Sequence, residues 1–340
     1  MRAPRRGGPF RRDDGGIARE RRPRHLAPRL QGRFLVALRA GDVPLLKEKL
    51  DALARTYHDA YLATDPLGIA HAYRGARDRE VAAFLSASLA FGNAAAIRMS
   101  VKRIMERLGP RPAAALRRIK PEESVRLFEG LYHRWVGPEA IGLFAQATGA
   151  ALRSEGSLEA LFLKGYRAEE ETLHGALIRF RNRLLGFLPV APANAKVGRG
   201  ISYLLPDPAS GSACKRLHLF LRWMVRPEDG LDLGLWKGPK THQLIIPLDT
   251  HIARIGRLLG LTDRKTPDLK MALDITRNLK RIDPDDPVRY DFAISRMGIL
   301  KHCPSKRNVK LCAGCPLQDA CRYWRRLPRR RKDAALQARG

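Results

Sequence analysis

Apolar residues recur at three- and four-residue spacing through most of the chain from residue 34 onward. This spacing places them on one face of a helix and predicts an all-α protein of about ten helices. Runs in which apolar and polar residues alternate, as in a half-buried strand, are scarce. The clearest helical segments are Leu45 to Leu62, Arg79 to Leu89, Ala94 to Leu108, Glu139 to Leu152, Glu170 to Leu185, Cys214 to Met224, His251 to Leu259, Leu269 to Leu279 and Val288 to Met297.

Helix-breaking residues separate these segments. The dipeptides Gly109-Pro110 and Gly137-Pro138 mark two such breaks. Asp249 and Thr250 precede an apolar helical face, and both residue types accept hydrogen bonds from the free N–H groups of a first helical turn. One of the two is therefore expected to cap that helix.

The composition is that of a globular protein with a strong excess of basic residues. Hydrophobic residues make up 44% of the 340 residues, and no stretch reaches the roughly 18 consecutive apolar residues of a membrane-spanning helix. We therefore expect a soluble, cytoplasmic protein with no membrane partner. Lys and Arg number 64 against 34 Asp and Glu, for a formal charge of +30. Such a charge favours a polyanionic partner.

Half of the excess positive charge lies near the two ends of the sequence. Residues 1–33 carry eleven Arg and three acidic residues, a net of +8, and residues 322–340 carry a net of +7. The first segment has few large apolar residues and no apolar core of a secretory signal, so we expect a disordered basic tail. The two tails are either solvated arms or a grip on nucleic acid or an acidic partner. The remaining body still carries +15.

Four of the five cysteines are clustered near residue 310, with the spacing Cys303-x8-Cys312-x2-Cys315-x5-Cys321. Clustered thiols in a reducing compartment indicate metal ligands. Structural zinc more often takes two short pairs separated by a long loop, whereas compact, unequal gaps are typical of iron-sulfur ligation. An iron-sulfur cluster is favoured; zinc and unligated thiols are the alternatives.

A loop of small residues between two helical segments is a candidate phosphate site. It runs from Leu204 to Arg216 and leads into the helix that starts near Cys214. Backbone N–H groups at a helix N-terminus bind phosphate, and Lys215 on the first turn could point toward a sugar. The alternative is an ordinary turn ahead of a basic amphipathic helix. Likewise, Asp249 is either a helix cap alone or a cap that also acts in catalysis.

The run Pro247-Leu248-Asp249-Thr250-His251-Ile252-Ala253-Arg254, followed by the four-cysteine loop, resembles the helix-hairpin-helix DNA glycosylases of the endonuclease III and adenine-glycosylase type. The resemblance implies a two-lobed helix-hairpin-helix glycosylase fold with an iron-sulfur cluster loop. More closely, the run Gly211-Ser212-Ala213-Cys214-Lys215-Arg216 is similar to a branch catalogued as DUF2400, a family of unknown function. In the glycosylase superfamily a nucleophilic lysine at the start of the second hairpin helix precedes the catalytic aspartate, and Lys215 and Asp249 match these positions in the same order.

The resemblance implies a base-excision DNA glycosylase, with AP-lyase activity if Lys215 acts as nucleophile. Lys215 and Asp249 would be catalytic, Gly211, Ser212, Ala213 and Arg216 would contact DNA, and the four clustered cysteines would hold one 4Fe-4S cluster. The expected partner is double-stranded DNA, bound by a monomer associated with the nucleoid.

The domain organisation that the resemblance implies has four parts. They are a basic tail (1–33), an iron-sulfur helical domain formed by 34–75 together with 249–323, a helical domain (76–248) that holds the hairpin at about 197–226, and a basic C-terminal tail (324–340).

Aromatic and basic residues supply further candidates. Phe91, Trp135, Trp223 and Trp236 either stack on a base or belong to the core, and Arg134 with His133 is a candidate DNA-facing patch. Two other functions remain open. The chain is either a non-catalytic iron-sulfur nucleic-acid-binding protein on the same scaffold or a structural interaction module with zinc.

Overall fold

A computed structural model describes residues 38–189 and 191–337, and every regular element in these residues is a helix. The all-α prediction is confirmed for this part of the chain. The longer helices are α1 (Val43–Thr56), α3 (Ala76–Ser88), α4 (Ala94–Leu108), α7 (Pro138–Glu155), α9 (His174–Leu185), α10 (Ala195–Leu204), α11 (Lys215–Val225), α12 (Thr250–Leu259), α13 (Leu269–Lys280), α14 (Asp291–Ile299) and α17 (Arg329–Gln337). The shorter elements are α2 (Leu67–His71), α5 (Pro112–Arg118), α6 (Pro121–Leu127), α8 (Leu158–Leu163), α15 (Val309–Cys312), α16 (Arg322–Arg325) and the 3-10 helices η1 (Ala40–Asp42), η2 (Asp59–Thr64), η3 (Pro208–Ser210), η4 (Thr241–Gln243) and η5 (Gln318–Ala320).

Helix α4 has the bounds that its sequence pattern predicts. Asn93 caps it by accepting a hydrogen bond from the backbone N–H of Ala96 at 2.8 Å. Gly109 ends it with a φ of 73°, a conformation that glycine adopts without a steric penalty. Local chemistry therefore determines both ends of this helix.

Two predicted helices are shorter than their apolar patterns. The chain leaves α1 at Tyr57 instead of Leu62, and the buried Tyr57 bonds through its hydroxyl to the ring of His302. Helix α9 begins at His174 instead of Glu170, because the backbone N–H just before it donates to the carbonyl of Gln243 at 2.9 Å. In both places a contact with a distant part of the chain overrides the local pattern.

Helix α3 is buried along most of its length and packs against α2, α5 and α11. Its Glu80 is 1% exposed and accepts hydrogen bonds from the backbone N–H groups of Leu158 and Glu159, at the start of α8, and from the indole N–H of Trp236 at 2.7 Å. Burial raises the pKa of Glu80, and these three hydrogen bonds oppose the rise. A buried carboxylate thus joins α3 to α8 and to the segment after α11.

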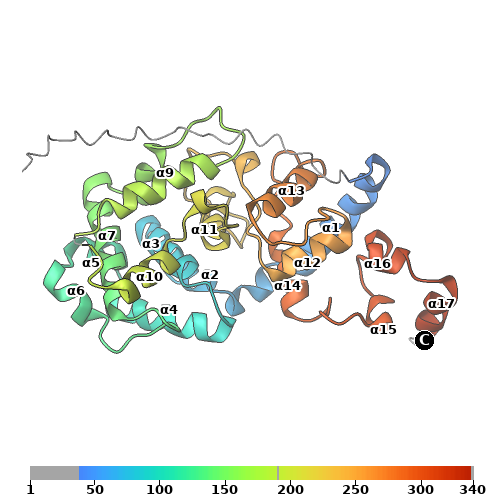
Figure 1. The fold of residues 1–340 in the computed structure, drawn as a ribbon, viewed down its shortest axis with the longest axis horizontal. Helices are drawn as coiled ribbons and strands as arrows, with labels where there is room; N and C mark the ends of the chain where they lie inside the picture. Colours follow the sequence, from blue (N-terminus) through green and yellow to red (C-terminus); the bar gives the residue numbers. More distant parts are fainter. Residues whose placement is uncertain (1–37, 190, 338–340) are drawn as a thin grey trace, which may run out of the picture. The chain divides into compact units, whose positions relative to one another are not determined.

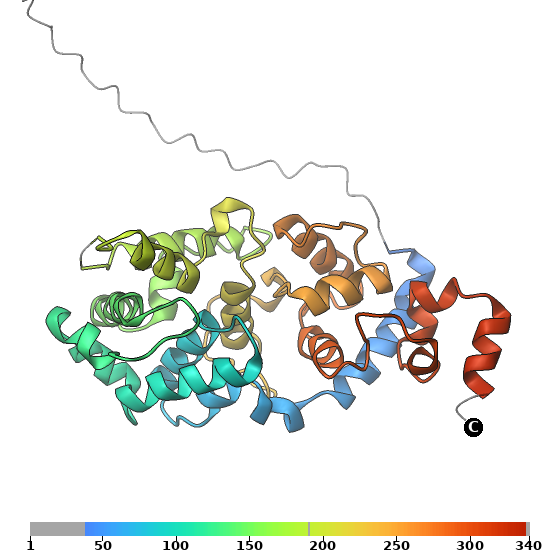
Figure 2. The same ribbon diagram turned by 60° about the horizontal axis from the view of Figure 1, so that its bottom comes forward.

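A second group of helices brings the two ends of the described chain together. Helix α1 packs against α14, and α12 packs against α13, α14 and α16. Figures 1 and 2 both show α1, in blue, beside the orange and red helices. Leu38 extends this contact, because its backbone N–H donates to the side chain of Asn278 at 2.9 Å.

The described residues, 38–189 and 191–337, belong to one compact unit. The division into a domain of 34–75 with 249–323 and a domain of 76–248 therefore stays a prediction. The predicted disordered tail, residues 1–33, lies outside the described residues. Helix α17 lies within the predicted C-terminal tail, and its Ala335 packs against Ala313 and Trp324. Part of that basic segment is thus an ordered helix on the cysteine loop.

Helix α11 carries a fully buried histidine. His218 is 0% exposed, and neither of its ring nitrogens has a hydrogen-bond partner among the described residues. The ring of His174 stacks near it, with 6.1 Å between ring centroids. Burial lowers the pKa of His218 to about 3, and the nearby His174 adds to the decrease.

We expect the buried His218 to make folding sensitive to mild acid. The unfolded chain takes up a proton near pH 6.5 and the folded chain does not, so stability present at neutral pH is lost as the pH falls below about 6.5. Between pH 7.5 and pH 5, the free energy of unfolding of the wild type should fall by about 2 kcal/mol more than that of a His218→Leu variant. Urea unfolding at pH 7.5 and pH 5 measures it, with His242→Leu, at an exposed position, as the control. Equal pH dependence in wild type and His218→Leu would contradict the expectation.

Candidate active site and nucleic-acid interface

Lys215 is the first residue of α11. The residue before it, Cys214, has a left-handed backbone with φ 40° and is the N-cap, so the chain turns sharply into the helix. One face of α11 lines a cleft, and this face carries Lys215, Leu219 and Arg222 at helical spacing. The opposite face of α11 packs on α3. The partly buried Lys215 therefore projects from the helix start toward this cleft.

Asp249 is the N-cap of α12, which confirms that one of Asp249 and Thr250 caps this helix. Its Oδ1 accepts hydrogen bonds from the backbone N–H groups of His251 at 2.8 Å and Ile252 at 2.7 Å. Its Oδ2 accepts a hydrogen bond from the hydroxyl of Ser295 on α14 at 3.0 Å. Both carboxylate oxygens are thus fixed in place.

The structure brings Lys215 and Asp249 to one cleft of about 660 Å³. The loop after α3, with Phe91 and Gly92, forms another part of its wall, and α14 contributes Asp291 and further residues. Lys215 and Asp249 line this cleft together although they are 34 positions apart in the sequence. Of the segment between them, residues 228–245 lie outside the lining of the cleft as the described residues define it.

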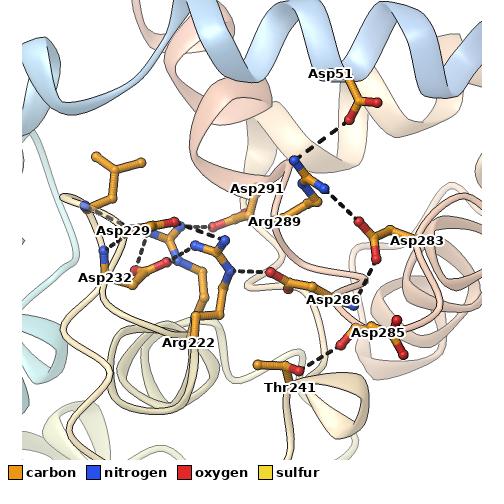
Figure 3. A network of polar contacts seen from close by, with 12 residues as sticks. Asp51, Arg222, Asp229, Asp232, Thr241, Asp283, Asp285, Asp286, Arg289 and Asp291 are labelled. Atoms are coloured by element: carbon orange, nitrogen blue, oxygen red, sulfur yellow. Dashed lines mark hydrogen bonds and ion pairs between the residues drawn. The ribbon is translucent and has the colours of Figure 1, made fainter.

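A buried ionic network lies under the cleft and joins α11 to α14. Arg222 donates to Asp232 through Nε at 3.1 Å and Nη2 at 3.0 Å, and through Nη1 to Asp291. Arg226 donates to Asp232 and, at 2.8 Å, to Asp286. Figure 3 shows Asp232 and Asp291 beside the guanidinium group of Arg222. Each charge here has at least one opposite partner, so removing one of them would leave a buried charge uncompensated.

Asp291 belongs to the network and also lines the cleft. Burial raises the pKa of its carboxyl to about 6; Asp249 contributes to the rise, whereas Arg222 and Lys215 oppose it. Sequence reasoning missed Asp291. Asp291 lies outside the sequence motif that contains Asp249. Its one local signal is Ser295, four residues later on the same helix, and this spacing of polar residues is too common to mark a site.

Aromatic rings and guanidinium groups lie at one edge of the cleft. The rings of Phe91, Trp135 and Tyr203 contact one another, with centroids 4.7 to 5.8 Å apart. Arg134 lies over the Trp135 ring at 4.4 Å, and Arg216 over the Phe91 ring at 4.7 Å. Trp135 is 42% exposed and Tyr203 is 41% exposed. We call these five residues the aromatic edge; it is continuous with the cleft because Phe91 belongs to both.

A tight turn presents part of the aromatic edge. His133 and Val136 exchange backbone hydrogen bonds at 3.0 Å, so Arg134 and Trp135 form the two-residue tip. Arg134 has a φ of 57°, in the left-handed region, and its side chain lies against Gly92. The turn thus holds Arg134 and Trp135 beside the loop that forms the cleft wall.

The prediction that His133 faces DNA together with Arg134 is wrong. His133 is 2% exposed, and its ring bonds to the hydroxyl of Ser100 and to the carbonyl of Phe91, both at 2.9 Å. Burial lowers its pKa, which the Phe91 carbonyl opposes. His133 therefore anchors the turn. Trp236 is likewise a core residue, because it is 2% exposed and bonded to Glu80.

Residues 205–214 form the turn between α10 and α11. The backbone N–H groups of Gly211, Ser212 and Cys214 donate within the turn, at distances of 3.3 to 3.4 Å. Hydrogen bonds of this length are weak, so an anion could replace them at little cost. Ser212 is exposed, whereas Ala213 is buried. The carbonyl of Gly211 accepts from the N–H of Leu269, which attaches the turn to α13.

The four clustered cysteines line one small cavity of about 40 Å³. Cys303 follows α14, and Cys321 precedes α16. Arg254, on α12, donates to the Cys303 Sγ at 3.0 Å and to the Cys303 carbonyl, so the helix that Asp249 caps also supports the cysteine loop. Burial raises the pKa of Cys315 to about 11, and the other three cysteines add to the rise.

No group of three or more His, Cys, Asp or Glu side chains within residues 38–189 and 191–337 has the arrangement expected for a single metal ion. The fifth cysteine, Cys214, lies apart from the loop. It is buried at the start of α11, and burial raises its pKa to about 11.

These observations describe an all-helical protein with a lysine–aspartate cleft beside an exposed aromatic edge. The chain belongs to the family described as "Protein of unknown function (DUF2400)", whose model matches residues 65–300. The matched residues include Lys215, Asp249 and Asp291 and end before Cys303. No curated protein and no solved structure matches the chain. In the part of the chain that the structure describes, no helix is both long and apolar enough to cross a membrane.

Proposed function

We propose that this protein is a DNA glycosylase that removes a damaged or mismatched base from duplex DNA, with strand cleavage through Lys215. One observation carries the proposal: Lys215 and Asp249 line the same cleft, and three hydrogen bonds hold the Asp249 carboxylate in place. Breaking the bond between a base and its sugar develops positive charge on the sugar, as in glycoside hydrolysis. A fixed carboxylate stabilises that charge without having to reorient.

Lys215 supplies the nucleophile in this proposal. Its amine would form a Schiff base with the sugar after base loss, which accounts for strand cleavage at the same site. The target base must first leave the helical stack, and this is least costly for a damaged or mismatched base. The cleft of about 660 Å³ is of a size that binds small molecules.

The DNA-binding surface in this proposal combines the aromatic edge with the turn between α10 and α11, residues 205–214. Trp135 and Tyr203 offer exposed rings for a base, Arg134 and Arg216 offer positive charge beside them, and the weakly bonded N–H groups around Ser212 offer a phosphate site at the α11 N-terminus. The net charge of the body favours the same polyanionic partner.

Replacing Trp135 with alanine is expected to weaken binding to a lesion-containing duplex by about 1–3 kcal/mol, the usual value of one base stacked on an aromatic ring. Fluorescence anisotropy at fixed salt measures the change. Tyr132→Ala is the matched control, because Tyr132 is 61% exposed but is not part of the aromatic edge. If both variants bind like wild type, the edge does not contact DNA.

The cofactor in this proposal is a 4Fe-4S cluster held by Cys303, Cys312, Cys315 and Cys321. The four thiols around one cavity, with a guanidinium donating to one sulfur, fit such a group. When bound, the cluster would cross-link the loop from 303 to 321 and order its basic side chains for contact with phosphates. Zinc in the same loop is the alternative.

We expect the purified protein to contain four irons and four sulfides, and Cys315→Ser to lose them. Cys214→Ser serves as the control, because Cys214 is buried away from the loop and should not change the iron content. Iron and acid-labile sulfide analysis, together with absorbance near 400 nm, measures this. One zinc per chain in the wild type, or iron loss in Cys214→Ser, would contradict the assignment.

A set of duplexes, each with one defined lesion, mismatch or abasic site, tests the proposed function. The expected result is base release or strand cleavage on at least one duplex and none on the undamaged one. If the protein binds these duplexes and processes none of them, the non-catalytic nucleic-acid-binding function replaces the proposal.

A further inference from the structure

Asp291 is the one buried carboxyl group of the cleft wall that the proposed function leaves without a role. It is the first residue of α14 and is 3% exposed, yet it lines the same cleft as Lys215 and Asp249. A buried charged carboxylate is costly unless it is paired, and Arg222 pairs with this one. The pairing explains how the carboxylate is tolerated but not why it faces the cleft.

Hydrogen bonds link α14, the helix of Asp291, to the elements that carry both proposed catalytic residues. On α11, Arg222 lies two turns after Lys215 on the cleft-lining face and bonds to Asp291. On α14, Ser295 lies one turn after Asp291 and bonds to Asp249. The electrostatic effects agree with this placement, because both Lys215 and Asp249 act on the Asp291 carboxyl.

Asp249 and Asp291 differ in their surroundings, because hydrogen bonds fix the first carboxyl group whereas burial dominates the second. Asp249 accepts three hydrogen bonds, which fix the position of its carboxylate. Burial raises the pKa of Asp291 to about 6, so it accepts a proton more readily than an exposed carboxylate does. If Asp291 becomes neutral, Arg222 keeps a counter-ion, because it also donates two hydrogen bonds to Asp232.

We propose that Asp291 accepts the proton that Lys215 must lose before it can act as a nucleophile. The proton moves from the ammonium Nζ of Lys215 to the carboxylate of Asp291, directly or across one water, and leaves a neutral amine. The amine adds to the aldehyde carbon of an abasic sugar. Asp291 then returns the proton to the departing hydroxyl, which leaves as water as the iminium forms. This step rests on the proposed function.

The charged groups that act on the Asp291 carboxyl lie on α11 and at the start of α12. Helix α1, which also packs on α14, carries Asp51, which accepts a hydrogen bond from the hydroxyl of Tyr290. Lys215 and Arg222 face it from α11, Asp249 from the start of α12, and Asp232 lies on the far side of Arg222. Three further ionisable residues, Asp65, His251 and Arg296, also line the cleft, and Arg296 is paired with Asp65. A histidine side chain is itself a candidate proton acceptor, so His251 has its own control.

The test measures the initial rate of covalent trapping on a duplex with one abasic site, with cyanoborohydride as reductant, from pH 5 to pH 8. For wild type we expect the rate to rise with pH around an apparent pKa near 6, as Asp291 ionises. Asp291→Asn should slow trapping at pH 7 by a factor of about 100 and remove this rise, because proton transfer by a positioned group contributes about that much. His251→Gln should keep the rise.

Other outcomes separate this inference from the proposed function. If wild type forms no trapped product, the proposed function fails. If wild type traps and folded Asp291→Asn matches its rate and pH profile, the inference alone is wrong. Melting curves check folding, and Asp291→Glu, which keeps a carboxylate, should retain the rise with pH. A wild-type rate that does not change between pH 5 and pH 7 would also overturn the inference, whether or not any variant folds.

Discussion

Asp249→Asn is expected to slow base release by a factor of about 100 to 1000, the usual effect of removing one preorganised charge-stabilising group. The substitution removes the negative charge that faces the developing cation. Asparagine caps helices about as well as aspartate, so α12 should lose about 1 kcal/mol or less. DNA affinity should stay close to that of wild type, because Asp249 contributes no positive charge to phosphate binding.

Asp268→Asn is the matched control for this experiment. Asp268 caps α13 by accepting a hydrogen bond from the backbone N–H of Met271 at 2.9 Å, and it is outside the cleft lining. The same change of side chain at a second helix cap should therefore leave base release unaltered. Single-turnover kinetics on a processed lesion measure both variants. Equal, wild-type rates in Asp249→Asn and Asp268→Asn would exclude an electrostatic role for Asp249.

Asp232→Ala is expected to lower the free energy of unfolding by about 3–5 kcal/mol, the usual loss when one partner of a buried ion pair is removed. Asp232 is 0% exposed and accepts hydrogen bonds from both Arg222 and Arg226. Its loss would leave two buried guanidinium groups with fewer counter-ions. Denaturant unfolding at neutral pH measures the change.

An exposed ion pair provides the comparison. Asp263 pairs with Arg322, and the side chain of Asp263 is 44% exposed and that of Arg322 is 31% exposed. Pairs of this kind contribute about 0–1 kcal/mol, so Asp263→Ala should change the unfolding free energy little. If Asp232→Ala were no more destabilising than Asp263→Ala, the network in Figure 3 would not be what holds α11 against α14.

Sequence patterns predicted the parts of the fold that local chemistry determines. Helix α4 has its predicted bounds because an asparagine cap and a glycine lie at its two ends. The cap of α12 was predictable for the same reason. The shorter helices α5 and α6 were missed, because each is too short to show an apolar period, although each begins with a proline suited to a first helical turn.

The site was predictable only where a motif marks it. Lys215 and Asp249 stand in recognisable runs, and the structure brings them to one cleft. Asp291 and Arg222 lie on separate helices far apart in sequence, and their role depends on packing that no local pattern encodes. The sequence groups His133 with Arg134 as a candidate DNA-facing patch because both stand beside Trp135, whereas the tight turn directs the His133 ring into the protein.

Mapping the covalent product on an abasic-site duplex with borohydride tests the central claim most directly. Mass spectrometry of the digested product should place the DNA adduct on the peptide that carries Lys215, and Lys215→Ala should form none. Lys196→Ala is the control, because Lys196 is an exposed lysine in the first turn of α10. An adduct on another lysine, or unchanged trapping by Lys215→Ala, would contradict the account.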